Sequence, residues 1–279
     1  MGGQGVRLSV RAEGPVDGPL LVLLHGFPES ARAFEPMVRR LAAEGFRVRA
    51  PDQRGYGDSD KPSRVSDMAL DHLVADVRAI VDAEGGGPAV VVGHDWGAAV
   101  AWAFAATHPE RVRALIPINV PHPSVMKAAI LSPGKQARKS WYIYAFQLPW
   151  LPELALRSGR LAKGLARTAR RGAFSEALLS ELVEEWRRPG AARGMINWYR
   201  AAFRYRSRLE LGTIEPPTLV LWGDRDAFLE KELADLSLER CANGRLIHFP
   251  EHTHWICHEA PERMVEEIVA FAHEVGEAE

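Results

Sequence analysis

The amino-acid sequence predicts an α/β fold, with a mostly parallel central sheet flanked by helices and interrupted by an all-helical segment. Short apolar runs typical of buried strands alternate with segments of helix length in the first part of the chain. This alternation stops at Pro121 and resumes at Thr218. Since 279 residues, 47% of them hydrophobic, can bury a substantial core, these observations indicate one large domain that carries an insertion.

The strands are expected where apolar residues follow one another without interruption. The run Leu20–Leu24 is an example, because a strand that is covered on both faces has no polar alternation. Pro51 is expected to stop the second strand. The predicted strands are residues 20–24, 46–50, 89–92, 114–119, 218–222 and 245–249.

The helices are expected where apolar residues recur at intervals of three and four. The segment 67–83 shows this period most clearly, through residues such as Leu70, Leu73, Val77 and Ile80. The segment 98–107 is a helix rich in small residues that follows directly on a strand. The predicted helices outside the insertion are residues 31–43, 67–83, 98–107, 230–240 and 261–273.

The insertion covers residues 121–212 and shows helical patterns with Pro and Gly punctuation but no convincing strand. We therefore predict a core domain from residues 1–120 and 213–279, and a helical cap from residues 121–212. The cap carries 17 Lys and Arg against 6 Asp and Glu, while the remainder carries 18 against 30. This asymmetry indicates either attraction of anionic substrates or surfaces, or simply a solvated face on exposed helices.

The overall composition argues against several classes of protein. A net charge of −1 argues against a nucleic-acid binder, and no apolar run approaches the roughly 18 residues of a membrane span. Residues 1–10 do not have the pattern of a signal peptide, and two cysteines, Cys241 and Cys257, make no disulfide framework. We expect a cytoplasmic enzyme.

A candidate nucleophile lies in Gly93-His94-Asp95-Trp96-Gly97, between an apolar strand and a helix of small residues. A sharp strand-to-helix turn lifts its central side chain above the sheet and needs small neighbours. In the better-known version the central residue is Ser, and here it is Asp95.

Two further residues follow in the chain order of this kind of site, which is nucleophile, acid and then histidine. Asp226 and His254 each come after the end of a later strand, at the edge where open α/β sheets place their sites. Asp224 is a rival for the acid and His252 for the base. The H-x-H spacing also allows a zinc site, but no acidic ligand is interleaved, so we predict no metal and no cofactor.

An oxyanion hole is expected from two backbone N–H groups, those of Phe27 and Trp96. Phe27 lies in the turn His25-Gly26-Phe27-Pro28 after the first buried strand, and Trp96 follows the nucleophile. Losing one such donor typically costs about 10²–10³ in rate.

An aspartate nucleophile changes the chemistry that the site can perform. A carboxylate that attacks a saturated carbon forms an ester, which water can cleave, whereas serine would form a stable ether. The general base for that water is His254, and Asp226 orients the imidazole. A departing epoxide oxygen is strongly basic and needs a proton donor, and tyrosine, with a reference pKa of about 10, suits that task.

The sequence resembles the epoxide hydrolases of the α/β-hydrolase superfamily over nearly its whole length. The resemblance lies in His25–Pro28, Asp52–Ser59, Gly93–Ala98 and His254–Trp255, and in two segments of the cap, Trp141–Pro149 and Asn197–Arg200. It implies the α/β-hydrolase fold, with catalytic tyrosines at Tyr142 and Tyr199 that protonate the epoxide oxygen and a vicinal diol as the product. Tyr144 is the alternative to Tyr142, and Thr253 stands where the family usually has Gly.

Two rival functions stay open at this point. A haloalkane or haloacetate dehalogenase uses the same aspartate, and the indole of Trp96 could hold a halide. However, Phe27 and Trp96 stand where those enzymes commonly have other residues. A non-catalytic receptor for a small ligand is the second rival. The predicted partners are an epoxide and water, while the identity of the epoxide and the formation of a homodimer are not determined by the sequence.

Overall fold

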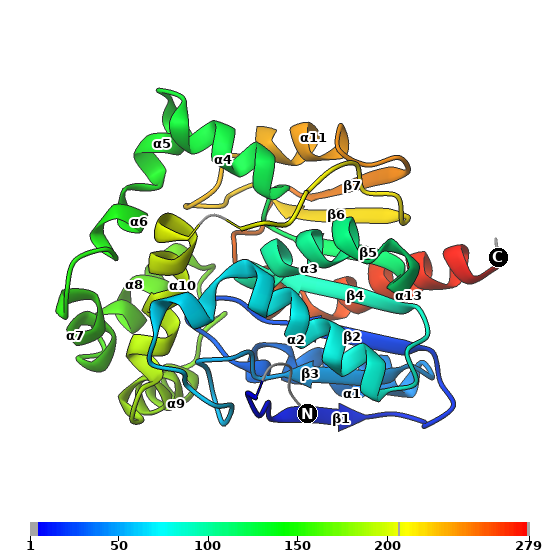
Figure 1. Cartoon of the computed structure of the whole chain (residues 1–279), viewed down its shortest axis with the longest axis horizontal. Helices are drawn as coiled ribbons and strands as arrows, with labels where there is room; N and C mark the ends of the chain where they lie inside the picture. The colour runs from blue at the N-terminus through cyan, green and yellow to red at the C-terminus, as the bar shows by residue number, and fades with distance from the viewer. Residues whose placement is uncertain (1–4, 206, 278–279) are drawn as a thin grey trace.

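The computed structural model describes residues 5–205 and 207–277, and its centre is a seven-stranded sheet (Figure 1). The strands lie in the order β1-β3-β2-β4-β5-β6-β7. Only β1 is antiparallel to its neighbour, β3, and all other pairs are parallel. Their bounds are β1 Val10–Glu13, β2 Leu20–Leu24, β3 Arg47–Pro51, β4 Ala89–His94, β5 Val112–Ile118, β6 Thr218–Gly223 and β7 Gly244–Phe249.

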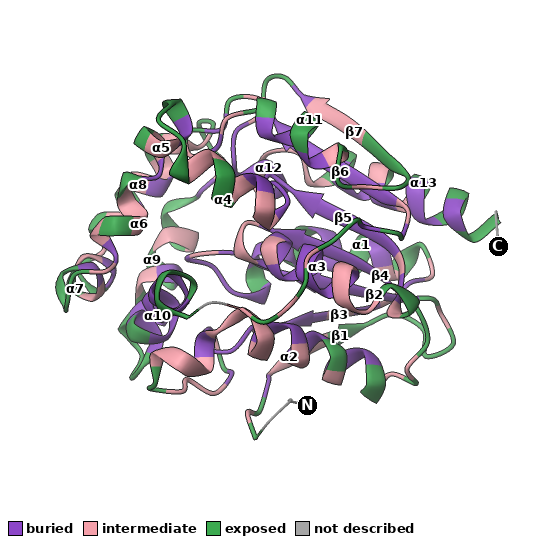
Figure 2. Ribbon diagram, turned by 45° about the horizontal axis from the view of Figure 1, so that its top comes forward, coloured by how far each residue is buried: buried purple, intermediate pink, exposed green. Residues whose placement is uncertain are grey.

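Helices cover both faces of this sheet, because alternate residues of its central strands point to opposite sides. In β2, Leu20, Val22 and Leu24 belong to one buried apolar cluster, whereas Leu21 and Leu23 belong to a second. Helices α2 (Leu70–Ala83), α3 (Trp96–Thr107) and α11 (Glu232–Leu238) contribute to the first cluster. Helices α1 (Glu35–Ala43), α12 (Ile256–Glu259) and α13 (Pro261–Glu277) contribute to the second. The buried strands and the half-exposed helices are visible in Figure 2.

The chain between β5 and β6 forms seven helices in its described part and lies over the end of the sheet at which the parallel strands finish (Figure 1). Two indole N–H groups fasten it there: Trp186 donates to the carbonyl of Pro28 at 2.7 Å, and Trp198 donates to the carbonyl of Arg54 at 3.0 Å. The helices are α4 Pro123–Leu131, α5 Lys135–Lys139, α6 Trp141–Ala145, α7 Leu151–Arg157, α8 Arg160–Thr168, α9 Glu176–Arg187 and α10 Ala191–Arg204.

The predicted α/β fold with a mostly parallel sheet is confirmed, with corrections to individual elements. The edge strand β1 was not predicted, because its four residues are partly exposed and contain no apolar run. Strand β3 ends at Pro51 as expected, but it includes Pro51 as its last residue. The predicted helix at 31–43 is a 3-10 turn, Ala31–Phe34, followed by α1, and the one at 67–83 is likewise a 3-10 turn followed by α2. Within the described chain, no helix is long and apolar enough to cross a membrane.

Candidate active site

Asp95 lies at the turn between β4 and α3 with φ of 50° and ψ of −123°, a backbone conformation that side-chain-bearing residues rarely adopt. The turn is possible because its neighbours are glycines. A Cβ atom on Gly93 would overlap the backbone of Gly97, and one on Gly97 would overlap the carbonyl of Leu24. The strained turn therefore holds the Asp95 carboxylate in a fixed position beyond the end of β4.

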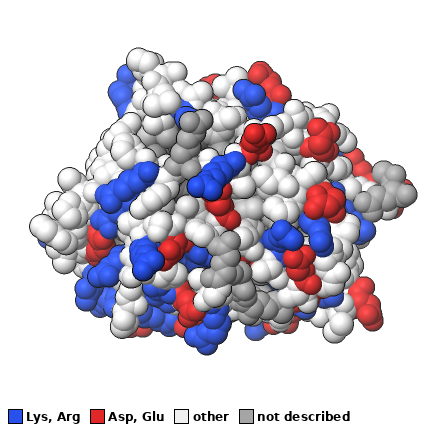
Figure 3. All heavy atoms as spheres, viewed as in Figure 1, with Lys and Arg blue, Asp and Glu red and all other residues white. Residues whose placement is uncertain are grey.

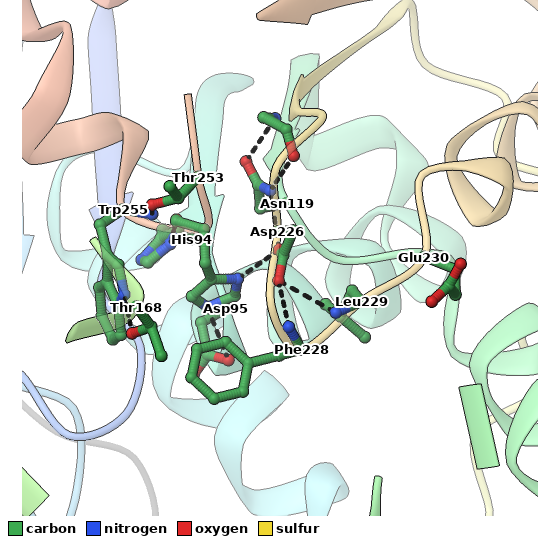
Figure 4. A network of polar contacts seen from close by, with 12 residues as sticks. His94, Asp95, Asn119, Thr168, Asp226, Phe228, Leu229, Glu230, Thr253 and Trp255 are labelled. Carbon is green, nitrogen blue, oxygen red and sulfur yellow. Dashed lines mark hydrogen bonds and ion pairs between the residues drawn. The ribbon is translucent and has the colours of Figure 1, made fainter. Parts of the chain in front are cut away.

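His254 lies between two carboxylates. Its Nδ1 atom is 2.7 Å from Oδ2 of Asp226, and its Nε2 atom is 3.5 Å from Oδ2 of Asp95. Asp226 is buried and accepts further hydrogen bonds from the backbone N–H groups of Phe228 at 2.7 Å and Leu229 at 3.0 Å (Figure 4). The structure thus brings together three residues, of which Asp226 and His254 are 28 positions apart and Asp95 lies 131 positions before Asp226.

The charges in this group reinforce one another. Burial disfavours the charged form of His254, but the hydrogen bonds and charges of Asp226 and Asp95 outweigh it and raise the pKa of the imidazole to about 10. Burial likewise works against an ionised Asp95, yet His254, His94 and the Phe27 N–H together lower the pKa of this carboxyl below its usual value. Asp95 is therefore an anion and His254 a cation at neutral pH in the free protein.

The turn after β2 directs a backbone donor at Asp95. The Phe27 N–H donates to Oδ1 of Asp95 at 2.7 Å, and a Cβ atom on Gly26 would overlap the Asp95 side chain. His25 holds the turn, since its Nε2 atom accepts from the N–H of Gln53 at 3.0 Å. Trp96 opens α3, and N–H groups in the first turn of a helix have no acceptor inside the helix. The two expected oxyanion donors are thus adjacent to the carboxylate.

Tyr142 and Tyr199 reach this site from helices α6 and α10. Their ring centroids are 6.1 Å apart, and the ring of Tyr199 is 5.1 Å from the rings of both Phe27 and Trp96. Burial, together with the negative charge of Asp95, raises the pKa of both phenols above the ordinary value. Both hydroxyls therefore stay protonated and able to donate at neutral pH.

The alternative site residues that the sequence left open either have other partners or point to solvent. Asp224 pairs with Nδ1 of His248 at 2.5 Å, and the His252 ring contacts Arg170 at 2.9 Å. Tyr144 is 49% exposed. His252, His254 and His258 have separate partners and form no shared cluster, and among the residues that the structure describes no three His, Cys, Asp or Glu side chains are grouped to hold a metal.

Three residues of the site were missed in the sequence. Asn119, at the end of β5 with φ of 51°, donates to Oδ2 of Asp226 at 2.9 Å. The His94 ring nitrogen Nε2 lies 2.8 Å from the carbonyl of His254. Glu29 forms a buried pair with His258 at 2.6 Å that joins the turn after β2 to helix α12. A polar residue directly after a parallel strand could have indicated Asn119, but the other two contacts join segments more than 150 residues apart.

Thr253 takes a supporting position. Its N–H and hydroxyl donate to the two oxygens of Glu259 at 2.8 and 2.6 Å, and its hydroxyl also accepts from the N–H of Trp255 at 3.2 Å. A glycine could supply only the backbone contact. The hydroxyl therefore stabilises the loop of His254 at the position where the sequence departs from its family.

Comparison with known proteins places this fold and site in a family. Residues 19–261 match the model of the alpha/beta hydrolase fold, so the chain belongs to the α/β-hydrolase fold family. It is 43% identical over 261 residues to the AB hydrolase superfamily protein YfhM of Bacillus subtilis (strain 168), with 92% of this chain and 91% of that protein covered.

The similarity to epoxide hydrolases that the motifs predict is also confirmed. The chain is 37% identical over 279 residues to epoxide hydrolase 4 of Homo sapiens, covering 97% of this chain and 76% of that protein. A crystal structure of Bacillus megaterium epoxide hydrolase in complex with an inhibitor superposes with a TM-score of 0.88 at 26% identity, with 98% and 99% of the two chains covered.

Proposed function

We propose that this protein adds water to an epoxide and releases a vicinal diol, through a covalent ester on Asp95. The observation that carries the proposal is the pairing of an ionised carboxylate, Asp95, with two protonated phenols, Tyr142 and Tyr199. An epoxide needs both, since its carbon accepts a nucleophile while its oxygen takes up a proton. The similarity to proteins named epoxide hydrolase supports the same activity.

In the first step, Oδ2 of Asp95 attacks one epoxide carbon. A carbon–oxygen bond forms to the carboxylate, the ring carbon–oxygen bond breaks, and the departing oxygen takes a proton from Tyr142 or Tyr199. Oδ1 of Asp95 accepts the Phe27 N–H at 2.7 Å, whereas Oδ2 faces Nε2 of His254 at the longer distance of 3.5 Å, so Oδ2 is the oxygen that attacks. Esterification removes the negative charge next to His254 and so weakens its hold on its proton.

In the second step, neutral His254 takes a proton from water, which attacks the ester carbonyl. The negative charge on the carbonyl oxygen is held by the N–H groups of Phe27 and Trp96. Collapse of this intermediate breaks the bond to the alkyl oxygen, which receives the proton from His254. The acid proton left on Asp95 passes to the tyrosinate. His254 takes up from solvent a proton that replaces the one it released to solvent after esterification, so the anionic Asp95 and the cationic His254 of the free protein are restored. Asp226 keeps the imidazole oriented at 2.7 Å throughout.

The aromatic side chains around Asp95 favour epoxide opening over the dehalogenase alternative. A halide would need the Trp96 indole as a donor, and the Tyr199 ring packs against that indole with a centroid distance of 5.1 Å. The two buried phenols, Tyr142 and Tyr199, would also not be needed as proton donors, because a halide leaves as a stable anion without a proton.

The proposal is tested by assaying styrene-type, aliphatic and fatty-acid epoxides beside haloalkanes and haloacetates. We expect diol from at least one class of epoxide, and loss of product in Asp95→Ala. Release of halide without any diol would select the dehalogenase instead. Tight binding of an epoxide that Asp95→Ala leaves unchanged, without turnover, would indicate a receptor.

The ester is tested by one turnover in ¹⁸O-water with the protein in excess over the epoxide. The diol should be unlabelled, because its new oxygen comes from Asp95, and the label should appear in the carboxylate of Asp95. Label in the first diol would show that water attacks the epoxide directly.

The remaining expectations stay proposals. Residues 1–120 and 213–279 would form the core domain, and residues 121–212 a cap that presents Tyr142 and Tyr199 to Asp95. A cytoplasmic location is a further proposal, and a homodimer is one possible assembly of the chain.

A further inference from the structure

The outer surface of the insertion carries an unusual number of exposed apolar side chains. Among the described residues, nine of the eleven large apolar side chains that are exposed lie between Leu131 and Tyr205. We call six of them, on α6, α7, their connection and α10, the apolar patch: Trp141, Tyr144, Leu148, Trp150, Leu154 and Phe203.

These side chains lie on elements that are packed together. The rings of Tyr144 and Phe203 are 6.0 Å apart, the backbone of Leu154 donates to the carbonyl of Trp150 at 2.9 Å, and the guanidinium of Arg200 on α10 donates to the carbonyl of Leu148 at 2.7 Å. The four aromatic side chains are 49–73% exposed, which at about 150–250 Å² each gives about 370–620 Å² in total. This area already equals the largest apolar patch of a typical monomer, about 300–600 Å², before the leucines are added.

Unpaired cations lie next to the patch in the chain. Arg138 precedes Trp141 by three residues, Arg157 follows Leu154 by three, and Arg204 adjoins Phe203. All three are exposed, and none forms an ion pair within the described part of the chain. Figure 3 shows a mostly uncharged surface at the end of the molecule formed by α6 and α7, with Lys and Arg beside it.

We propose that the apolar patch docks on an anionic lipid surface without crossing it. Exposed tryptophans and tyrosines beside unpaired arginines fit the boundary between lipid headgroups and acyl chains, where rings are half-buried and cations meet phosphates. A second copy placed on the same patch by two-fold symmetry would instead bring the unpaired arginines of both copies together. Residues 121–212 carry 17 basic and 6 acidic residues, so this part of the chain repels a second copy of itself and attracts an anionic lipid surface.

The docked face is the outer side of the helices that carry the two site tyrosines. Trp141 is 66% exposed, whereas its neighbour Tyr142 is directed inward and contacts the ring of Phe228 at 5.9 Å. Docking would therefore leave the side chains of Tyr142 and Tyr199 directed into the protein. Binding to vesicles can for this reason be measured separately from turnover of an epoxide.

The test is sedimentation of the full chain with two kinds of vesicle, phosphatidylcholine alone and an equal mixture of phosphatidylcholine and phosphatidylglycerol. We expect binding to the mixed vesicles that weakens at high salt, because exposed charges are screened. Trp141→Ser with Trp150→Ser should weaken binding about tenfold or more. Each of Arg138→Gln and Arg204→Gln should weaken it about fivefold.

The matched control is Val16→Ser with Leu236→Ser, which removes two exposed apolar side chains outside the patch and should leave vesicle binding unchanged. All variants should keep the melting temperature of the parent. Absence of binding to mixed vesicles, or binding that the tryptophan variant retains, would overturn the proposal. So would a dimer in light scattering that only the tryptophan variant dissociates, since a second copy would then cover the patch.

Discussion

The two chemical steps should depend differently on pH, because the charge of Asp95 controls the proton on His254. In the free protein, Asp226 and Asp95 raise the pKa of His254 to about 10 against the effect of burial. Formation of the ester neutralises Asp95 but leaves the 2.7 Å contact to Asp226 intact. Ester formation, the first half of the reaction, is therefore the change that alters the pKa of His254.

The size of the effect follows from the distance between His254 Nε2 and Asp95 Oδ2, which is 3.5 Å. At an effective dielectric constant of about 20, two unit charges at this distance attract by about 5 kcal/mol. Losing this attraction lowers the proton affinity of His254 by about three orders of magnitude. The imidazole that is charged in the free protein can then act as a base near neutral pH.

Rapid mixing separates the steps, with tryptophan fluorescence as the readout because Trp96 adjoins Asp95. We expect the rate of ester formation to be nearly constant from about pH 6 to 9, and ester hydrolysis to rise with pH and level off near neutrality. If hydrolysis instead rose only near pH 10, or showed the same profile as ester formation, the charge of Asp95 would not be what holds the proton.

Two further predictions concern groups around the nucleophile. Tyr142→Phe with Tyr199→Phe should slow ester formation by about 10²–10⁴ because the departing oxygen loses its acid, whereas Tyr144→Phe, an exposed phenol on the same helix, should keep the parent rate. A single-turnover rate that the double variant retains would refute the tyrosine assignment. Glu29→Gln should lower the free energy of unfolding by about 1–3 kcal/mol, since it removes the negative charge from the acceptor of a buried, charge-assisted hydrogen bond. The pKa of Glu29 is lowered by His258, and that of His258 is raised by Glu29 against burial. This stabilisation is therefore complete between the ordinary values of 4.5 and 6.5, and is lost as the pH falls below or rises above this window. Denaturant titrations of both proteins across pH measure the difference, and a difference that stays constant with pH would exclude a charged pair.

The sequence by itself was enough for the fold class and for most of the proposed site. Apolar runs such as Leu20–Leu24 predict strands buried on both faces, and these strands form the sheet centre. The order of Asp95, Asp226 and His254 predicts that they meet at the edge where parallel strands end, and the structure brings them into contact. Strands and turns can be predicted in this way because an apolar run or a tight turn depends on residues that are neighbours in the sequence. The edge strand β1 has no such run and was missed.

The tertiary structure alone decided which side chains are partners. Asp224 and Asp226 share one loop, yet only Asp226 points to His254, while Asp224 pairs with His248. The sequence did not show the Glu29–His258 pair for the same reason, nor the exposure of Trp141 next to the inward-directed Tyr142. The direction of a side chain is set by the segments packed against it, and these come from distant parts of the chain.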